Sequence, residues 1–228
     1  MKKKVAVAMS GGVDSSLTAA LLIEQGYDVI GVTMTLSDES REAGGSTAVS
    51  DAKKVADALN IPHYVVNYHK KFKDDVIKYF ISEYAKGRTP NPCVRCNNTV
   101  KFGSLLKDCL ELGADCVATG HYARIEQDEK TGRYLLKKGL DVRKDQSYVL
   151  YTLTQDVLKH FMLPLGNYSK EKTRELAGKM NLPVANKPES QEICFIPNDD
   201  YKAYLKAKAP HILKPGDIVD VNGNKLGR

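Results

Sequence analysis

The sequence lacks the features of membrane and secreted proteins. No apolar run in its 228 residues is long enough to cross a bilayer, and the apolar stretch of the N-terminal MKKKVAVAMSGG is too short for a secretory signal. The five cysteines are an odd number without the spacing of a disulfide framework. The excess of positive over negative charge is also small. The net charge is +6, which permits an anionic partner without requiring one. We therefore expect a cytoplasmic protein that has no membrane partner.

Strand and helix patterns alternate through the first 121 residues. Apolar strand patterns occur at 4–9, 28–34, 63–68 and 116–121, and amphipathic helix patterns at 13–27, 50–60, 72–84 and 99–112. In the first helix, one face carries Val13, Leu17, Ala20 and Leu21. Such alternation predicts the α/β class, with a Rossmann-like, doubly wound parallel sheet that is covered by helices on both faces.

The pattern changes after residue 121. Residues 122–136 indicate a hairpin that turns at 130–132, and short helices are expected near 146–153, 169–180 and 200–207. Alternating residues around Asn222-Gly223 predict a second hairpin. We therefore expect a nucleotide-binding domain over 1–153, a small helical domain over 154–210, and the start of a C-terminal β segment over 211–228.

The string Ser10-Gly11-Gly12-Val13-Asp14-Ser15 lies between the first predicted strand and the first predicted helix. Its two glycines permit a tight turn, the helix N-terminus offers free N–H groups, and the serines add hydroxyl donors, so the string predicts a pyrophosphate cradle. The sequence has no Gly-Lys-Ser/Thr, which excludes a Walker-type loop. Asp14 would repel bare phosphate, so its place in a cradle makes sense if it holds Mg²⁺.

Cys93 and Cys96 form a pair in a stretch whose two prolines indicate a loop between helices. A zinc finger needs four ligands, whereas the candidates in motif context are Cys93, Cys96 and Cys194. A thioredoxin-type pair would follow a strand at the start of a helix. A sulfur carrier and an iron–sulfur ligand set both remain open. Cys109 and Cys116 fall on a helix face and in a strand, so we interpret both as core residues.

Several motifs together resemble one enzyme family. SGGVDS is similar to the signature of the N-type (PP-loop) ATP pyrophosphatases. GRTPNPCVRCN, KFG, ATGHYAR, KDQSYVLYTL, PLG and SQEICFI follow it in the order of the bacterial tRNA-specific 2-thiouridylases. This resemblance covers nearly the whole chain. It implies that ATP is cleaved between its α and β phosphates to adenylate a tRNA, and that sulfur then replaces the C2 oxygen of the wobble uridine in the anticodon loop, releasing AMP.

The resemblance also implies roles for individual residues. ATP would contact Ala8, Met9, Ser10, Gly11, Gly12, Val13, Asp14, Ser15, Met34 and Gly120. The target base would face Asn91, Pro92 and Cys93, and tRNA near that base would contact Lys144, Asp145 and Gln146. Positive charge for phosphates could come from Arg88, Arg95 and Lys101. Cys96 would be the attacking cysteine, and Cys194 would carry persulfide sulfur. The helical region over 154–210 would bind tRNA.

Two departures from the family leave the sulfur chemistry open. Many members have Asp where this chain has Cys93, and the family continues into a C-terminal β-domain, so we expect either a natural short form or a truncated piece. In one hypothesis, Cys96 and Cys194 form a persulfide pair. In the other, which we favour because it gives Cys93 a role, Cys93, Cys96 and Cys194 hold a [4Fe–4S] cluster with one open iron. The sulfur donor would be a persulfide carrier protein or free sulfide.

Two rival functions are consistent with parts of the sequence. Another PP-loop adenylating ligase or amidotransferase would use the same cradle and need no cysteine. A metal-binding RNA adaptor without catalysis would use the cysteines and would release no pyrophosphate from ATP.

Overall fold

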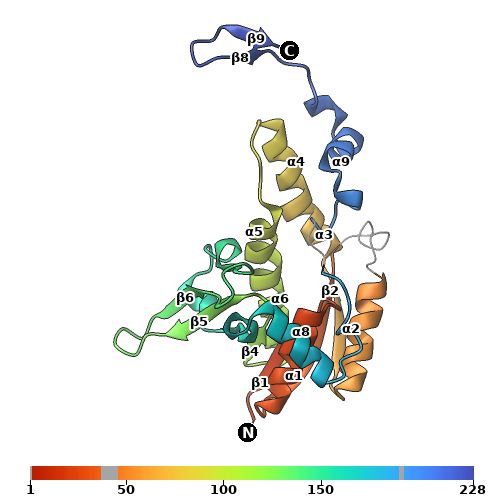
Figure 1. Ribbon diagram of the computed structural model, residues 1–228, viewed down its shortest axis with the longest axis vertical. Coiled ribbons are helices and arrows are strands. Elements are labelled where there is room, and N and C mark those ends of the chain that lie inside the picture. The colour runs from red at the N-terminus through yellow and green to blue at the C-terminus, as the bar shows by residue number, and fades with distance from the viewer. Residues whose placement is uncertain (1, 37–45, 190–192) are drawn as a thin grey trace.

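A parallel sheet forms the centre of the molecule. The computed structural model describes residues 2–36, 46–189 and 193–228. Within these residues, five strands form this sheet in the order β3-β2-β1-β4-β7 (Figure 1). They are β1 (Lys4–Ala8), β2 (Asp28–Thr35), β3 (His63–Asn67), β4 (Cys116–Ala118) and β7 (Phe161–Met162). The strand order reverses between β1 and β4, which confirms the doubly wound sheet predicted from the sequence.

Helices cover both faces of the sheet. On one face, α1 (Val13–Glu24) and α2 (Ser46–Ala58) pack against Val5 and Val7 of β1. The other face carries Ala6 and packs against α3 (His69–Phe72), η2 (Lys73–Ile77), α4 (Lys78–Ala85), η3 (Asn97–Ser104) and α6 (Leu105–Glu111). Successive side chains of a strand point to opposite faces, so the central strands need apolar residues at every position.

The outward face of α1 is buried by a later part of the chain. The four apolar residues predicted to share one helix face, Val13, Leu17, Ala20 and Leu21, pack against Leu165 in η5 (Pro164–Asn167) and Ala177 in α8 (Lys170–Lys179). This packing brings α8 beside the start of α1, and therefore beside the predicted phosphate cradle.

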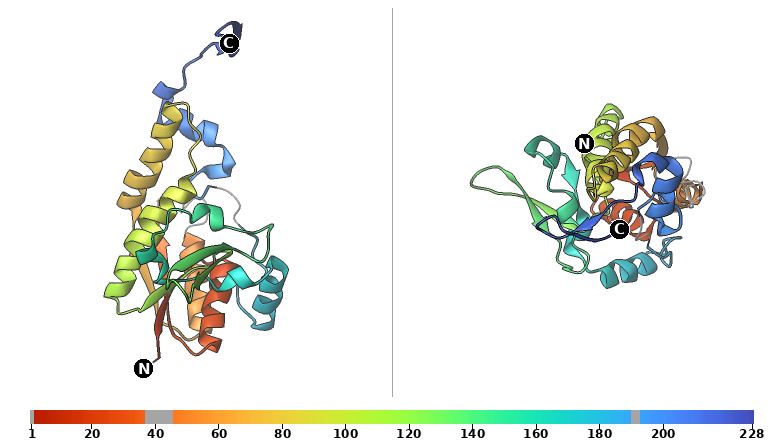
Figure 2. Two further views of the ribbon diagram at one scale, coloured as in Figure 1. Left: turned by 90° about the vertical axis from the view of Figure 1, so that its left-hand side faces the viewer. Right: turned by 90° about the horizontal axis from the view of Figure 1, so that it is seen from above.

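Both predicted hairpins are present. β5 (Ala123–Gln127) pairs with β6 (Tyr134–Lys138), and β8 (Ile218–Val219) pairs with β9 (Lys225–Gly227), each pair antiparallel. Figure 2 shows that the second hairpin projects away from the sheet at the C-terminal end of the molecule.

The segments that follow β6 are short. Besides β7, η5, α8 and the second hairpin, they are η4 (Ser147–Val149), α7 (Gln155–Leu158), η6 (Pro197–Asp199), α9 (Tyr201–Lys208) and η7 (Pro210–Ile212). The sheet includes β7, which lies after residue 153, where we expect the first domain to end. None of the helices in the described parts of the chain combines the length and the apolar character that a membrane span requires.

The cysteine pair lies in a helix, so the expectation of a loop was wrong. Asn91 caps the helix α5 (Pro92–Cys96), because its side chain accepts hydrogen bonds from the N–H groups of Cys93 at 3.0 Å and Val94 at 3.3 Å. Pro92 occupies the first turn, where its missing N–H costs nothing. The helix continues through the π-helical segment η3 into α6.

Candidate active site

The predicted cradle follows β1 and ends at the first turn of α1. Gly11 has a φ of +71°, and a Cβ there would lie 2.4 Å from the carbonyl oxygen of Ala48 in α2. Only glycine therefore fits this turn. Gly12 precedes the helix in an extended conformation, and within the described residues no side chain caps the N–H groups of the first turn. Those N–H groups and the positive end of the helix dipole suit an anion.

The serine hydroxyls of the cradle form hydrogen bonds within the loop. Ser15 Oγ accepts a hydrogen bond from the N–H of Ser10 at 3.1 Å, and Ser16 Oγ donates to the carbonyl of Gly12 at 2.8 Å. Ser16 is fully buried, so its hydroxyl serves the loop and not a ligand. The backbone N–H groups are left as the principal donors of the cradle.

Gly120 lies against the cradle. A Cβ at this position would come within 3.0 Å of the backbone carbon of Asp14 and the nitrogen of Ser15. Gly120 follows β4, and Met34 lies in the last part of β2. Because β1, β2 and β4 are parallel neighbours, their carboxyl ends meet at one edge of the sheet. The structure therefore brings the residues predicted for ATP to the crevice at which α/β sheets bind ligands.

Asp14 already has a cationic partner. Its Oδ1 accepts hydrogen bonds from Lys170 Nζ at 2.6 Å and from the Tyr122 hydroxyl at 2.9 Å. Lys170 also pairs with Glu189 at 2.5 Å. Sequence reasoning missed Lys170 and Glu189, and no local pattern marks them, since only the fold brings them to the cradle.

A second lysine reaches the cradle from the part of the chain that follows α8. Lys187 Nζ donates to the carbonyl of Gly11 at 3.1 Å and pairs with Asp51 of α2 at 2.7 Å. Lys187 was also missed. Two ammonium groups therefore lie beside a loop that has no lysine of its own, which adds positive potential where phosphates would bind.

The three predicted functional cysteines lie near one another. Desolvation raises the pKa of Cys194 to about 12, with the negative charges of Cys96 and Cys93 contributing to the rise and the Lys101 ammonium opposing it, although part of the residue is exposed. Burial likewise raises the pKa of Cys96, while the Lys101 ammonium opposes the shift. Cys109 and Cys116 are buried, which confirms that they are core residues.

The thiols do not form a metal site in this arrangement. Within residues 2–36, 46–189 and 193–228, no three His, Cys, Asp or Glu side chains are arranged so that they could hold a metal ion. An iron–sulfur cluster would need three converging sulfurs here. The cysteines therefore do not fit the cluster as they stand, and the cluster hypothesis stays a prediction.

Cys194 is fixed by its neighbour in the sequence. The ring of Phe195 is buried and makes edge-to-face contacts with Phe72 and Phe80, with centroids 5.6 and 5.4 Å apart. It also contacts Tyr204 of α9 at 5.6 Å. This aromatic cluster holds the segment of Cys194 against α3 and α4.

Lys101 lies in η3, next to Phe102, whose ring centroid is 5.8 Å from that of His121. Its charge acts on the thiols of Cys96 and Cys194 and also on His121, whose pKa burial lowers to about 3. His121 is therefore neutral, and its Nδ1 is 2.8 Å from Thr119 Oγ1. Since His121 directly follows Gly120, the contact between Phe102 and His121 connects the helical run that follows Cys96 to the edge of the cradle.

All three residues predicted to contact tRNA have internal partners. Asp145 accepts a hydrogen bond from the N–H of Gly139 at 2.9 Å, and Gln146 Oε1 accepts one from the N–H of Tyr122 at 3.0 Å. Lys144 pairs with Glu189 at 2.8 Å and keeps about a third of its side chain exposed. Asp145 and Gln146 therefore hold the segment in place, and Lys144 is the residue that offers charge.

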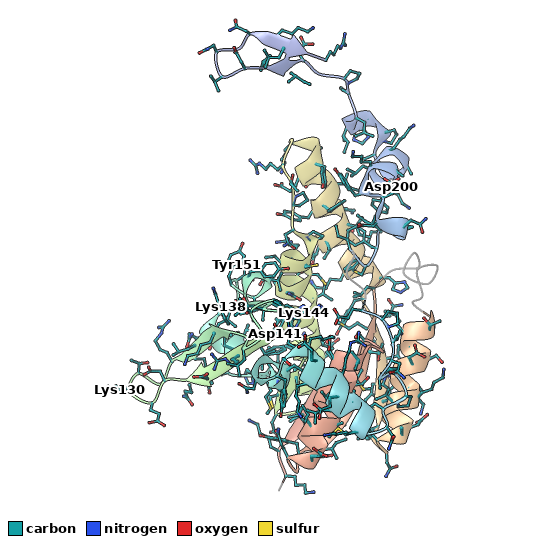
Figure 3. All side chains as sticks on the ribbon, viewed as in Figure 1. Lys130, Lys138, Asp141, Lys144, Tyr151 and Asp200 are labelled. Atoms are coloured by element: carbon teal, nitrogen blue, oxygen red, sulfur yellow. The ribbon has the colours of Figure 1, made fainter. Side chains whose placement is uncertain are left out.

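Exposed aromatic rings lie beside this segment. Tyr148 is 63% exposed and Tyr151 is 72% exposed. Figure 3 shows Tyr151, Lys138 and Lys144 on the same side of the molecule. Buried Asn97, which follows Cys96, donates from Nδ2 to the carbonyl of Val149 at 3.1 Å, so this surface is joined directly to the helix of the cysteine pair.

The other predicted basic residues are engaged elsewhere. Arg88 pairs with Glu83 at 3.3 Å. The Nε of Arg95 donates to the carbonyl of Asp75 at 3.1 Å, and its guanidinium lies over the ring of Tyr79. The contacts of Arg95 hold α5 against η2 and α4, and the pair of Arg88 holds the connecting segment against α4.

Comparisons with known proteins agree with this geometry. The chain is 57% identical to the tRNA-specific 2-thiouridylase MnmA 1 of Caldanaerobacter subterraneus subsp. tengcongensis and 52% identical to MnmA of Clostridioides difficile. Each alignment covers the whole of this chain and 65% of the relative, so the chain spans slightly less than two thirds of the length of these relatives.

Two solved structures share the fold. The U34-tRNA thiolase NcsA from Methanococcus maripaludis with its [4Fe-4S] cluster has a TM-score of 0.54 at 20% identity, covering 92% of this chain and 69% of that one. A 4-thiouridine synthetase–RNA complex with bound ATP has a TM-score of 0.52 at 19% identity, covering 92% of this chain and 51% of that one. The family model of the tRNA methyl transferase HUP domain matches residues 3–198, and the chain belongs to this family.

Proposed function

We propose that this chain carries the ATP-binding and sulfur-transfer centre of a tRNA 2-thiouridylase. The observation that carries the proposal is the packing of Phe102, in the helical run that continues from Cys96, against the ring of His121, with the ring centroids 5.8 Å apart. His121 follows the glycine that packs on the cradle. An adenylating site and a sulfur site that lie close together suit a reaction in which the two steps act on the oxygen and the carbon of the same carbonyl group. The relatives named as tRNA-specific 2-thiouridylases support the same reaction.

The first step would be adenylation. ATP would place its phosphates on the N–H groups of the α1 first turn, with Lys170 and Lys187 adding positive charge. The C2 oxygen of the wobble uridine would attack the α phosphorus, and the bond between the α and β phosphates would break to release pyrophosphate. Mg²⁺ bound with ATP would be held by Asp14 and would withdraw charge from the phosphates, since such sites use one or two carboxylates plus the phosphates themselves.

The second step would transfer sulfur. A persulfide on Cys194 would present its outer sulfur to C2, the bond from C2 to the adenylated oxygen would break, and AMP would leave. The Cys96 thiolate would attack the inner sulfur of Cys194, so that the two cysteines end as a disulfide, which an external dithiol reduces before the next turnover. The absence of a three-ligand group among the described residues favours this route over a cluster.

The tRNA would lie across Tyr148, Tyr151 and Lys144. Exposed rings beside positive charge suit unstacked bases of a single-stranded loop. The asparagine bridge from Asn97 to Val149 joins this surface to Cys96. A wobble base flipped out of the loop would then reach the cysteine without a long movement of the protein.

The test is an incubation of the 228-residue protein with tRNA, ATP, Mg²⁺ and a persulfide donor. Pyrophosphate is measured together with 2-thiouridine in the digested tRNA, for the wild type and for Cys96→Ser. We expect the wild type to form both products and Cys96→Ser to form no 2-thiouridine. Full product formation by Cys96→Ser would indicate a cysteine-independent ligase. Absence of tRNA-dependent pyrophosphate release by the wild type would indicate an RNA adaptor and would overturn the proposal.

A further inference from the structure

Lys170 is a buried lysine in an unfavourable position. Its side chain is 8% exposed and lies at the first residue of α8, where the positive end of the helix dipole disfavours a cation. Burial of an ammonium group costs free energy unless carboxylates surround it. Two carboxylates meet this need, Asp14 at 2.6 Å and Glu189 at 2.5 Å, and the ring of Tyr122 lies 5.6 Å from the ammonium.

The two carboxylates come from different parts of the site. Asp14 belongs to the first turn of α1, at the cradle, whereas Glu189 lies five residues before Cys194. Glu189 also pairs with Lys144 at 2.8 Å. The side chains Lys144, Glu189, Lys170 and Asp14 therefore form one ion-pair chain. This chain joins the segment that faces solvent beside Tyr148, the segment of Cys194, and the cradle.

We propose that Lys170 is a positioning residue that holds the segment of Cys194 at the phosphate cradle through Glu189. The segment has a second anchor in Phe195, which is fixed in the aromatic cluster at α3 and α4. Cys194 thus lies between one apolar anchor and one ionic anchor, and the ionic anchor is the one connected to the ATP site. The proposal rests on the proposed function, in which Cys194 supplies sulfur to a base that is adenylated at the cradle.

The ionic anchor should affect the two half-reactions differently. Glu189→Gln removes the charge from one side of Lys170 and leaves the pair between Lys170 and Asp14 in place. Adenylation, which uses the cradle, should continue. Sulfur transfer, which needs Cys194 at a fixed place, should fall. A defect in folding alone would lower both reactions together, so the ratio of 2-thiouridine to pyrophosphate separates positioning from stability.

The experiment compares wild type, Glu189→Gln, Lys170→Arg and the control Glu175→Gln. Glu175 lies on the exposed side of α8 and pairs with Lys172 and Lys179. We expect Glu189→Gln to lower the ratio of 2-thiouridine to pyrophosphate about tenfold, the equivalent of one lost hydrogen bond to a charged group. Lys170→Arg, which keeps the charge, should retain most of the ratio, and Glu175→Gln should match the wild type.

A second readout does not depend on tRNA. The rate at which iodoacetamide alkylates Cys194, followed by mass spectrometry of the 228-residue protein, reports how firmly its segment is held. We expect this rate to rise severalfold in Glu189→Gln and to stay unchanged in Glu175→Gln. Unchanged alkylation and an unchanged product ratio in Glu189→Gln would overturn the positioning role. If the wild type forms no 2-thiouridine while alkylation still responds to Glu189→Gln, the proposed function fails and the anchor stands.

Discussion

The hydroxyl of Tyr122 donates a hydrogen bond to Asp14 Oδ1 at 2.9 Å, across 108 positions of sequence. The same hydroxyl lies 3.1 Å from Thr173 Oγ1 of α8. The backbone of Tyr122 is bonded in both directions to Gln146, since its N–H donates to Gln146 Oε1 and its carbonyl accepts from the N–H of Gln146. One tyrosine therefore connects the cradle to the segment that precedes the exposed rings.

Replacement of Tyr122 by Phe should weaken ATP use more than it weakens the fold. The variant removes one hydroxyl and leaves the buried ring, so we expect the free energy of unfolding to fall by about 1 kcal/mol. Asp14 would lose one of the two donors that orient it, and the KM for ATP in pyrophosphate release should rise severalfold. Urea unfolding and an ATP titration measure the two effects, with the exposed Tyr64→Phe as control. Equal KM values for Tyr122→Phe and the control would contradict the orienting role.

Sulfur transfer should depend on pH more steeply than adenylation does. Burial raises the pKa of Cys96, so the thiol is protonated at neutral pH, and only the thiolate attacks. The rate of 2-thiouridine formation should rise by about tenfold per pH unit below that pKa, while pyrophosphate release should not follow. Lys101→Met removes the charge that opposes the shift and should slow sulfur transfer at each pH. Lys107→Met on the exposed side of α6 is the matched control.

The raised pKa of Cys194 makes stability sensitive to alkaline pH. The pKa of Cys194 rises from 9.0 to about 12 on folding. Above pH 9 the unfolded chain loses the thiol proton while the folded protein keeps it, so the contribution to stability is complete below pH 9 and is lost as the pH rises toward 12. Urea unfolding on either side of pH 9 should show this decrease, and it should be smaller in Cys194→Ser. An identical decrease in Cys194→Ser would assign the effect to other groups.

Cys93 should not be required for thiolation. We expect Cys93→Ser to keep most of the wild-type rate, and Cys96→Ser and Cys194→Ser to lose it, because the persulfide route uses only the last two. Anaerobic reconstitution followed by iron and sulfide analysis provides the second measurement. Stoichiometric iron in the wild type that disappears in Cys93→Ser would instead support the cluster hypothesis.

The affinity for tRNA should depend on salt and on Tyr151. Phosphate contacts make log affinity fall linearly with log salt concentration. Loss of an aromatic platform costs about tenfold in affinity for single-stranded nucleic acid, so Tyr151→Ala should bind an anticodon stem-loop about tenfold more weakly. The control Tyr64→Ala removes a ring that is 44% exposed on the edge strand β3. Filter binding at several salt concentrations measures both effects, and equal affinities of the two variants would exclude Tyr151 from the contact surface.

The sequence predicts those features whose signals are local. Val5, Ala6 and Val7 are apolar in succession because β1 is covered on both faces, and Gly11 and Gly12 mark the turn after it. Asn91 and Pro92 carried a local signal that we interpreted wrongly, since a capping residue followed by proline begins a helix as readily as it forms a loop.

Contacts between distant segments could not be predicted in this way. Lys170 and Asp14 are 156 positions apart, and nothing in the sequence of α8 distinguishes Lys170 from the lysines on its exposed side. The strand β7 has two residues, which is too short for a periodic pattern. Both features depend on how α8 and the edge of the sheet pack against the rest of the protein. That packing is determined by the whole sequence and not by a local pattern.

The hydrogen bond from Asn97 to Val149 has a mechanical consequence. It fastens the helix that ends with Cys96 to the exposed segment that carries Tyr148, and Asn97 is 1% exposed, so water does not compete for this bond. The two segments should therefore move as one rigid body during thermal fluctuation. A nucleotide bound on the rings would therefore keep a constant distance to the Cys96 sulfur while the rest of the tRNA moves.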